Sequence, residues 1–241
     1  EFKDILSPSG TEVNIIPVLQ GDGFMKIDES ELPDSLPLLA LRNAVLFPGT
    51  IYPITIGREK SIKLIEDAEK NNAFIGAVPQ NDISVEDPRK EDLYQFGTVA
   101  KILKTLEMPD GTITAILQGF KRFSLDAVTE YEPYMLGLVH YLNDTAPDNS
   151  DKNVRMIAES LKEKAISIIR MSSFVSKEAT SALKSIDGFE FLVNFIATTI
   201  EVDNFDDKIQ LLQYGDLKQR AMKLLAVLDT QIELLKIKQD I

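Results

Sequence analysis

The chain has 241 residues, of which 44% are hydrophobic and only 11 are proline and 12 glycine, so it can form one large domain or two smaller ones. It holds no cysteine and one histidine, which excludes disulfides, thiol nucleophiles and cysteine- or histidine-rich metal sites. The net charge is −12, and Lys and Arg form no cluster that would neutralise phosphates, so nucleic acid is not an expected partner.

Hydrophobic stretches are all shorter than the roughly 18 to 20 apolar residues that a membrane helix needs. The first residues lack the basic start of a signal peptide. We therefore expect no membrane contact and a cytoplasmic location.

The first 35 residues form an acidic segment. They carry eight acidic and two basic side chains and show no sustained period of 2 or 3.6. Residues 1–35 are therefore predicted to be a flexible acidic leader.

Residues 36–144 show the pattern of a β-rich domain with one helix. Short apolar runs predict strands. The helix is amphipathic, with Ile62, Leu64 and Ile65 on one side and charged residues on the other. The predicted strands are 36–41, 51–56, 73–78, 97–106, 112–117 and 134–142, and the helix is 58–71.

A hairpin is indicated between two of these strands, at Met108-Pro109-Asp110-Gly111-Thr112. Proline presets φ, the aspartate side chain can bond back to the backbone, and glycine supplies a positive φ. The turn predicts that the two strands pair antiparallel.

Beyond a polar, turn-rich break at 145–151, the hydrophobic period changes from 2 to 3.6. Residues 150–241 are therefore predicted to be a helical bundle. Its helices are expected near 154–169, 177–184, 189–200 and 206–214, followed by a long helix from about 216. That last helix reaches Ile241 without a capping signal, so we expect the natural protein to continue.

The sequence contains no recognisable catalytic, cofactor or metal site. None of the 12 glycines is followed by lysine, which excludes a phosphate-binding loop of the Walker type. A Ser-His-Asp site would have to use His140, which lies in a strand-like run where a structural role is favoured. Acidic pairs such as Glu86-Asp87 lack the spacing of a calcium loop.

Three apolar side chains are candidates for contact with a partner protein. Phe189, Phe191 and Phe195 are spaced by two and four residues, so one helix cannot direct all of them into a single core. We take Phe189, Phe191 and the turn residue Met108 as candidate protein-binding residues.

Ordered blocks of sequence resemble the amino-terminal domain family of Lon proteases. The resemblance extends over about 36–241 and departs at Ala40, where proline is usual, and at Asn43, where aspartate is frequent. The blocks are Leu36-Pro37-Leu38-Leu39-Ala40-Leu41-Arg42-Asn43, Phe47-Pro48-Gly49, Gly57-Arg58-Glu59-Lys60-Ser61, Glu86-Asp87-Pro88, Gly97-Thr98-Val99-Ala100, Pro109-Asp110-Gly111-Thr112 and Asp207-Lys208-Ile209-Gln210-Leu211-Leu212.

These motif residues suit structural roles. Pro48-Gly49 predicts a turn after Phe47, and Gly57 is expected to permit a strand-to-helix corner. Arg42 is expected to pair with a loop carboxylate. Gly97, Pro109, Asp110 and Gly111 complete the set of structural motif residues.

The resemblance implies an α+β chain: a PUA-like β-rich pseudo-barrel with one amphipathic helix, then an all-α bundle ending in a long helix. It also implies an ATP-dependent serine protease that degrades damaged, misfolded and regulatory proteins as a homohexamer. Its AAA+ ATPase, which uses ATP and Mg²⁺, and its Ser-Lys peptidase would lie outside this chain. The present region would then recognise substrates and support assembly without being catalytic.

Two other interpretations stay open. PUA-like folds elsewhere bind RNA, so a free-standing RNA-binding module is the alternative, which the acidic charge disfavours. The long last helix could instead begin a coiled coil, which would make the region chiefly an assembly device.

Overall fold

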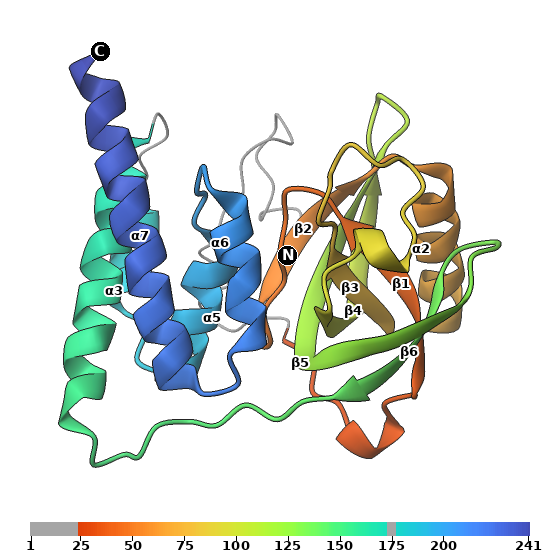
Figure 1. Ribbon diagram of the computed structural model, residues 1–241, viewed down its shortest axis with the longest axis horizontal. Coiled ribbons are helices and arrows are strands. Elements are labelled where there is room, and N and C mark those ends of the chain that lie inside the picture. Colours follow the sequence, from red (N-terminus) through yellow and green to blue (C-terminus); the bar gives the residue numbers. More distant parts are fainter. Residues whose placement is uncertain (1–23, 173–176) are drawn as a thin grey trace. The chain divides into compact units, whose positions relative to one another are not determined.

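The computed structural model describes residues 24–172 and 177–241, and it forms two compact units (Figure 1). The β unit is Phe24–Asn143 and the helical unit is Asp144–Ile241. The α+β class expected from the sequence is confirmed. Residues 1–23 of the expected leader lie outside the described residues.

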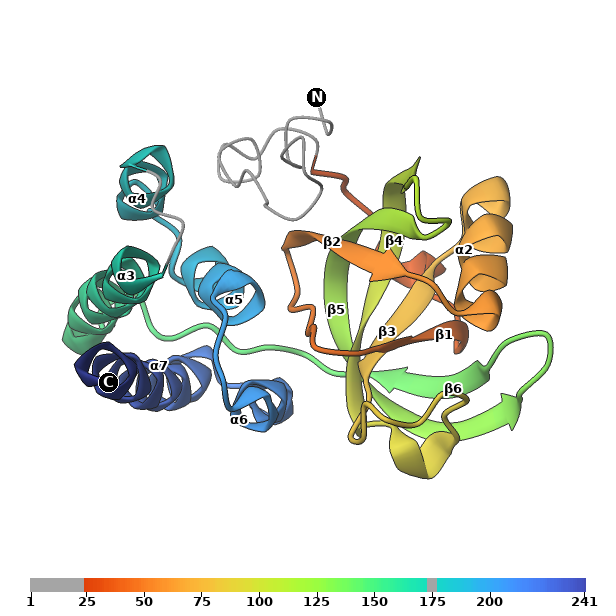
Figure 2. The ribbon, with the colours of Figure 1, turned by 90° about the horizontal axis from the view of Figure 1, so that it is seen from above.

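The β unit is a six-stranded sheet that closes on itself. The strand order is β2-β5-β4-β3-β1-β6, and a further pairing of β5 with β6 closes five of these strands into a ring (Figure 2). Closure leaves β2 as the edge strand, where Pro53 lacks the N–H that a central strand would need. The elements are β1 (Ser35–Leu41), β2 (Ile51–Ile56), α2 (Glu59–Asn71), β3 (Ile75–Pro79), β4 (Phe96–Glu107), β5 (Ile113–Glu130) and β6 (Leu136–Tyr141), with short 3₁₀ turns η2 (Glu29–Glu31) and η3 (Lys90–Asp92).

The strand β5 differs most from the sequence prediction. It was expected to end at Leu117 but continues through Gly119 to Glu130. Gln118-Gly119 interrupts the apolar alternation, and irregularities in the β4–β5 and β5–β6 registers bend the strand. Because of its length, β5 pairs with β2 and β4 and also with β6.

The strand β1 is apolar throughout because both of its faces are buried. Leu39 and Leu41 join one hydrophobic cluster, whereas Leu38 and Ala40 join another. Side chains alternate between the two sides of a strand, so a run with little polar alternation suits a position between two cores.

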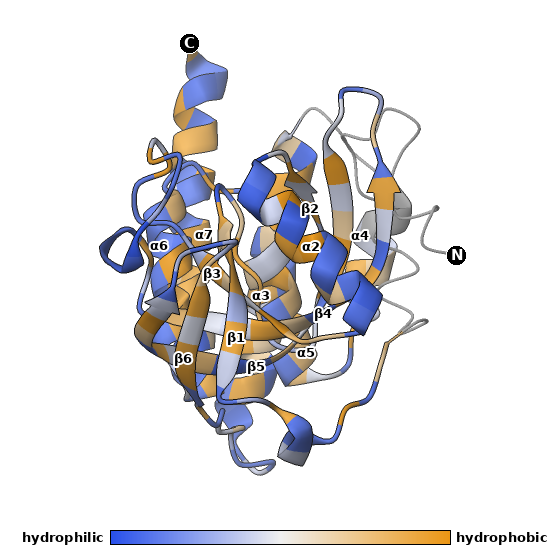
Figure 3. Cartoon of the chain, turned by 90° about the vertical axis from the view of Figure 1, so that its right-hand side faces the viewer, coloured by the Kyte–Doolittle hydropathy of each residue, from blue (hydrophilic) through white to orange (hydrophobic). Residues whose placement is uncertain are grey.

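The helix α2 covers the first of these clusters. Leu64, Ile65 and Ala68 are its buried residues, and all three belong to that cluster. Figure 3 shows the bands of hydrophilic and hydrophobic residues that alternate along this helix. The spacing of three and four residues puts the apolar bands on one side, as an amphipathic helix requires.

Part of the expected leader belongs to the β unit. The backbone N–H of Met25 donates to Gln118 Oε1 at 2.7 Å, and Gln118 Nε2 donates back to the Met25 carbonyl at 2.8 Å. Leu32 packs against a core cluster, and Lys121 pairs with Glu29 at 2.8 Å. Residues 24–35 therefore differ from the predicted flexible segment because a side-chain amide and apolar contacts hold them.

The turn motifs have the geometry that their residues favour. Gly49 and Gly111 have φ values of 72° and 88°, in the region that other residues avoid. Asp110 Oδ1 accepts hydrogen bonds from the Thr112 backbone N–H at 3.0 Å and from its hydroxyl at 2.6 Å. Phe47, before the Pro48-Gly49 turn, is fully buried.

Two other motif residues, Gly97 and Gly57, differ in whether a side chain would fit in their place. A Cβ on Gly97 would lie 2.6 Å from the Ala77 carbonyl oxygen, so no side chain fits there. Gly57 has no positive φ, and a Cβ would meet only Thr112 Cγ2 at 3.5 Å. Gly57 is therefore compatible with the strand-to-helix corner, but neither its backbone conformation nor the space around it requires glycine.

Arg42 contacts the loop that follows β3. Its Nη2 donates to the Val85 carbonyl at 3.0 Å and lies 3.5 Å from Glu86 Oε2. Arg58 donates to Gln80 Oε1 at 2.6 Å and to the Ala40 carbonyl at 2.8 Å. The two arginines thus hold this loop against the start of α2.

The helical unit is built around α3 and α7, which lie side by side in Figures 1 and 2. Lys218 pairs with Asp151 and Lys164 with Asp229, so the two helices run parallel. The expected helix at 206–214 is shorter and ends as a 3₁₀ turn. The elements are α3 (Lys152–Met171), α4 (Lys177–Lys184), α5 (Phe189–Thr199), α6 (Phe205–Ile209), η4 (Gln210–Gln213) and α7 (Leu217–Asp240).

The helix α5 is the core of this unit. All seven residues from Leu192 to Thr198 are buried, which is typical of a helix surrounded by its neighbours. Phe195 is buried, whereas Phe189 and Phe191 are half-buried. This division follows from their spacing around the helix.

A buried lysine closes the carboxyl end of α5. Lys208 Nζ donates to the Thr198 carbonyl at 3.1 Å and to the Ile200 carbonyl at 2.6 Å, which satisfies two groups that a helix end leaves unpaired. Burial lowers the pKa of Lys208 from 10.5 to about 7, and the charge of Glu201 opposes this shift.

The pKa of Lys208 generates a stability prediction. Because the folded pKa lies below the unfolded one, the folded protein binds fewer protons between pH 7 and 10.5, and stability rises with pH there. From pH 7 to 10, the free energy of unfolding of the wild type should increase relative to that of Lys208→Met by up to about 1.4 kcal/mol per pH unit. Urea unfolding followed by circular dichroism at 222 nm measures this difference.

The control for that experiment is Lys236→Met, which changes an exposed lysine of α7. Its difference from the wild type should stay flat with pH. A flat difference for Lys208→Met as well would show that Lys208 does not titrate in this window.

Candidate functional site

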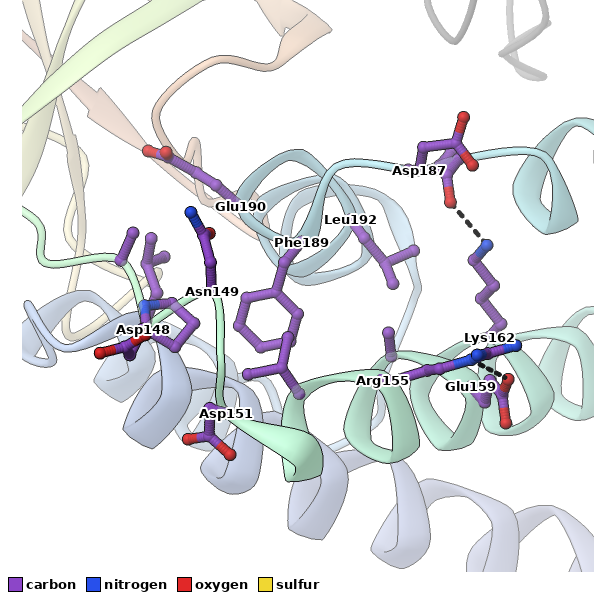
Figure 4. Close-up of a pocket in the computed structure, with 16 residues that line it drawn as sticks. Asp148, Asn149, Asp151, Arg155, Glu159, Lys162, Asp187, Phe189, Glu190 and Leu192 are labelled. Atoms are coloured by element: carbon purple, nitrogen blue, oxygen red, sulfur yellow. Dashed lines mark hydrogen bonds and ion pairs between the residues drawn. The ribbon is translucent and has the colours of Figure 1, made fainter.

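A groove of about 670 Å³ opens on the helical unit, within the roughly 300–1,000 Å³ range of binding pockets. It lies among the segment before α3, the first half of α3 and the start of α5 (Figure 4). The residues that line it are Ala146, Pro147, Asp148, Asn149, Asp151, Val154, Arg155, Ala158, Glu159, Lys162, Ile186, Asp187, Phe189, Glu190, Leu192 and Leu217.

The floor of the groove is apolar. Val154 and Ala158 come from successive turns of α3, and Leu192 and Leu217 come from α5 and α7. Phe189 extends from the first turn of α5 towards the start of α3 (Figure 4). Since Phe189 is half-buried, part of its ring can still contact a bound chain.

The rim of the groove is acidic. Asp148 and Asp151 lie at one end, where α3 begins, and Asp187 lies at the other (Figure 4). The Ser150 backbone N–H and hydroxyl donate to Asp148 and hold its pKa below the ordinary value. Lys218 and the Asn153 N–H do the same for Asp151. Both carboxylates are therefore ionised at neutral pH.

The two basic side chains of the groove are already engaged. Arg155 pairs with Glu159 one turn away at 3.4 Å. Lys162 Nζ donates to the carbonyls of Lys184 at 2.8 Å and Ile186 at 2.6 Å, which ties α3 to the segment before α5. In the described structure neither cation forms an ion pair with Asp148, Asp151 or Asp187.

A buried arginine positions one wall of this groove. Arg220 is fully buried, and its guanidinium donates to Asn194 Oδ1 at 2.7 Å and to Asp144 Oδ2 at 2.9 Å. Its Nη2 also donates to the Tyr214 carbonyl at 2.7 Å. The same side chain thus joins α5, α7 and the segment that leads to residues 146–151.

Backbone hydrogen bonds extend this attachment. The Thr145 N–H donates to the Gly215 carbonyl at 2.8 Å, and the Leu217 N–H donates to the Thr145 carbonyl at 3.0 Å. Asp151 then caps α3 by accepting a hydrogen bond from the Asn153 N–H. The wall at 146–151 is therefore anchored at both of its ends.

A second hollow, in the β unit, has less unpaired charge available to a ligand. It has a volume of about 510 Å³ and lies beside the start of α2. Lys60, on its edge, bridges Asp87 at 3.2 Å and Glu132 at 2.7 Å. Because both carboxylates are already paired with Lys60 and the groove of the helical unit is larger, that groove is the better candidate site.

The structure separates the three predicted protein-binding residues. Phe189 lines the groove. Phe191 is outside that lining and packs on Phe195, with 5.7 Å between the ring centroids. Met108 belongs to the β unit, where its N–H donates to the Thr112 carbonyl in the hairpin turn.

Sequence reasoning missed most of the groove. Val154 and Ala158 follow the helical period expected near 154–169, and both are half-exposed. The acidic residues near 148–151 and 187–190 have the composition of ordinary turns and helix starts. In the sequence, this surface is indicated only by the polar break at 145–151, Phe189 and the nearby acidic residues taken together.

The single histidine forms part of a Ser-His-Asp grouping that is not connected as a catalytic triad. His140 Nδ1 lies 2.8 Å from Asp126 Oδ1, and Ser124 is the cross-strand neighbour of His140. However, Ser124 is buried and its Oγ is approached by Gln95 Nε2 at 3.4 Å, with no hydrogen bond to His140 in the described structure. The bond between nucleophile and base that acyl transfer requires is not formed.

Residues 24–172 and 177–241 contain no group of three or more His, Cys, Asp or Glu side chains arranged to hold a metal ion. No helix in these ranges is long and apolar enough to cross a membrane.

The family model for the substrate-binding domain of the ATP-dependent protease La (Lon) matches residues 35–230. The chain belongs to the Lon substrate-binding domain family. The match includes the groove and Arg220, as well as the whole β-barrel. It does not favour the RNA-binding alternative.

Relatives in sequence are full-length Lon proteases. The chain is 43% identical to the Lon protease of Flavobacterium johnsoniae over 96% of its own length and 28% of that relative. It is 40% identical to the Lon protease of Parabacteroides distasonis over 100% of its length and 29% of that relative. The chain therefore spans less than a third of these proteins.

Solved structures show the same fold. The N-terminal domain of the Mycobacterium avium complex Lon protease matches 81% of this chain and 98% of its own, with a TM-score of 0.63 and 17% identity. The Lon N-terminal domain protein from Xanthomonas campestris matches 80% of this chain and 97% of its own, with a TM-score of 0.55 and 18% identity. At these identities the likeness concerns the fold alone.

The attachment of the groove wall can be tested at Arg220. Replacing it as Arg220→Met leaves the Asp144 carboxylate, whose side chain is 12% exposed, and the buried Asn194 amide without the guanidinium. Breaking a buried pair from one side costs about 3–5 kcal/mol, and the free energy of unfolding of the helical unit should fall by that amount. Arg155→Met, which removes an exposed ion pair, should change it by under about 0.5 kcal/mol.

Urea unfolding followed by circular dichroism at 222 nm compares the two variants. Equal stability of Arg220→Met and Arg155→Met would contradict the role of Arg220 as the anchor of this wall.

Proposed function

We propose that this chain is the substrate-recognition region of an ATP-dependent protease of the Lon type, and that it binds unfolded or damaged proteins through the groove of the helical unit. The observation that carries the proposal is the match to the Lon substrate-binding domain over residues 35–230. The groove supports it, because its apolar floor suits apolar side chains, which unfolded proteins expose more than folded ones do.

The size of the apolar surface sets the expected affinity. Burying one or two apolar side chains contributes roughly 1.5–3 kcal/mol each, and ordering the bound chain offsets part of this. Dissociation constants of tens of micromolar or weaker follow. Weak binding of this kind lets a substrate be released to the part of the protease that unfolds it.

The remaining functions belong to the parts that the longer relatives contain. We assign to them an AAA+ ATPase that uses ATP and Mg²⁺ and a peptidase with a Ser-Lys dyad. This chain has no Gly-Lys loop to hold a nucleotide. The full protein would work in the cytoplasm as a homo-oligomer, a hexamer by family resemblance, with this region also supporting assembly.

The proposed function is tested by fluorescence anisotropy of the 241-residue chain with a denatured model protein and its folded form. The denatured protein should bind and the folded one should not. Phe189→Ala, which removes the largest apolar side chain of the groove, should weaken binding about tenfold, or 1.4 kcal/mol.

Met222→Ala serves as the matched control, because Met222 is 51% exposed on α7 and lies outside the groove lining. Its binding should equal that of the wild type. Equal, negligible binding of the denatured and folded proteins would refute the proposed function. Equal losses in the two variants would refute the assignment to the groove.

A further inference from the structure

The negative charge of the helical unit is concentrated at the groove. Residues 144–241 contain sixteen Asp and Glu against thirteen Lys and Arg, a formal net charge of −3. The groove lining holds five acidic and two basic residues, which is also −3. The rest of the unit holds eleven of each, and one of these cations, Lys218, pairs with Asp151 of the lining.

Two of these carboxylates have no partner among the described residues. Asp187 and Glu190 form no hydrogen bond or ion pair with the residues in 24–172 and 177–241, and both side chains are exposed at the rim. Arg155 pairs with Glu159, and Lys162 donates to main-chain carbonyls, so neither forms an ion pair with Asp187 or Glu190 in the described structure. A ligand that brings a cation to either carboxylate can form an ion pair that the protein itself does not supply.

The carboxylates also lie at both ends of the apolar floor. Asp148 and Asp151 are near the start of α3, while Asp187 lies near Lys162, about three turns further along this helix (Figure 4). A chain that inserts an apolar side chain beside Phe189 would therefore place its flanking residues towards acidic groups on either side.

We propose that the groove selects, among unfolded segments, those in which an apolar residue is flanked by lysine or arginine. This inference rests on the proposed function and adds a charge preference to it. Apolar contact with the floor provides affinity, and the rim carboxylates attract basic flanks and repel acidic ones. Segments with equal hydrophobicity are then sorted by charge.

The test uses three fluorescent, unstructured peptides that share a Leu-Phe-Leu centre and differ in flanks of lysine, serine or glutamate. At low salt the lysine peptide should bind the 241-residue chain at least tenfold more tightly than the glutamate peptide. The serine peptide should lie between them. Raising the salt concentration to about 0.5 M should bring the three affinities together, because exposed charges are screened.

Charge at the rim is then removed with the double variant Asp187→Asn and Glu190→Gln. It should reduce the lysine-to-glutamate preference at least threefold and leave the serine peptide unchanged. The control, Glu163→Gln with Glu233→Gln, changes the net charge equally at exposed positions outside the groove. It should keep the preference, and thermal melts check that both variants fold.

The outcomes separate the inference from the proposed function. If denatured protein binds but the three peptides bind equally at low salt, the charge preference is wrong and the proposed function stands. The same follows if the two double variants lose the preference equally. If neither the denatured protein nor any peptide binds, the proposed function itself fails.

Discussion

The buried guanidinium of Arg220 is the interaction on which the helical unit depends. Removing a charge from water is costly, and the bonds to Asp144, Asn194 and the Tyr214 carbonyl compensate for it. A buried charge of this kind contributes less to net stability than to selecting one arrangement of the segments packed around it. Here it fixes where the segment after Asn143 lies against α5 and α7.

The groove follows from that arrangement. With its wall anchored at Thr145 and capped onto α3 by Asp151, the segment cannot collapse over Val154, Ala158 and Phe189. An apolar floor stays partly open to solvent, and the turn residues that build the wall supply carboxylates. A surface suited to weak, charge-biased capture of extended chains therefore arises from ordinary capping and turn chemistry.

Much of the fold can be predicted from local patterns. The apolar run of β1, the Pro109-Asp110-Gly111 turn and the 3.6-residue period of α3 each indicate a local structure. The course of β5 past Gly119 could not be predicted, because its irregular pairing depends on strands distant in sequence. Arg220 likewise has the sequence context of a surface cation, and only the packed structure shows that it is buried.

The candidate site was predictable only at Phe189. Half-exposure of Val154 and Ala158 depends on how far α5 stands from α3, which no local pattern records. Charge concentration at the groove is also a three-dimensional property, since its acidic residues come from two segments about forty residues apart.

The most direct test of this account is photocrosslinking of a denatured substrate to the 241-residue chain, with the crosslinked residues identified by mass spectrometry. The account predicts crosslinks in 146–159 and 186–192, on both sides of the groove. Crosslinks confined to the β unit, residues 24–143, would contradict it.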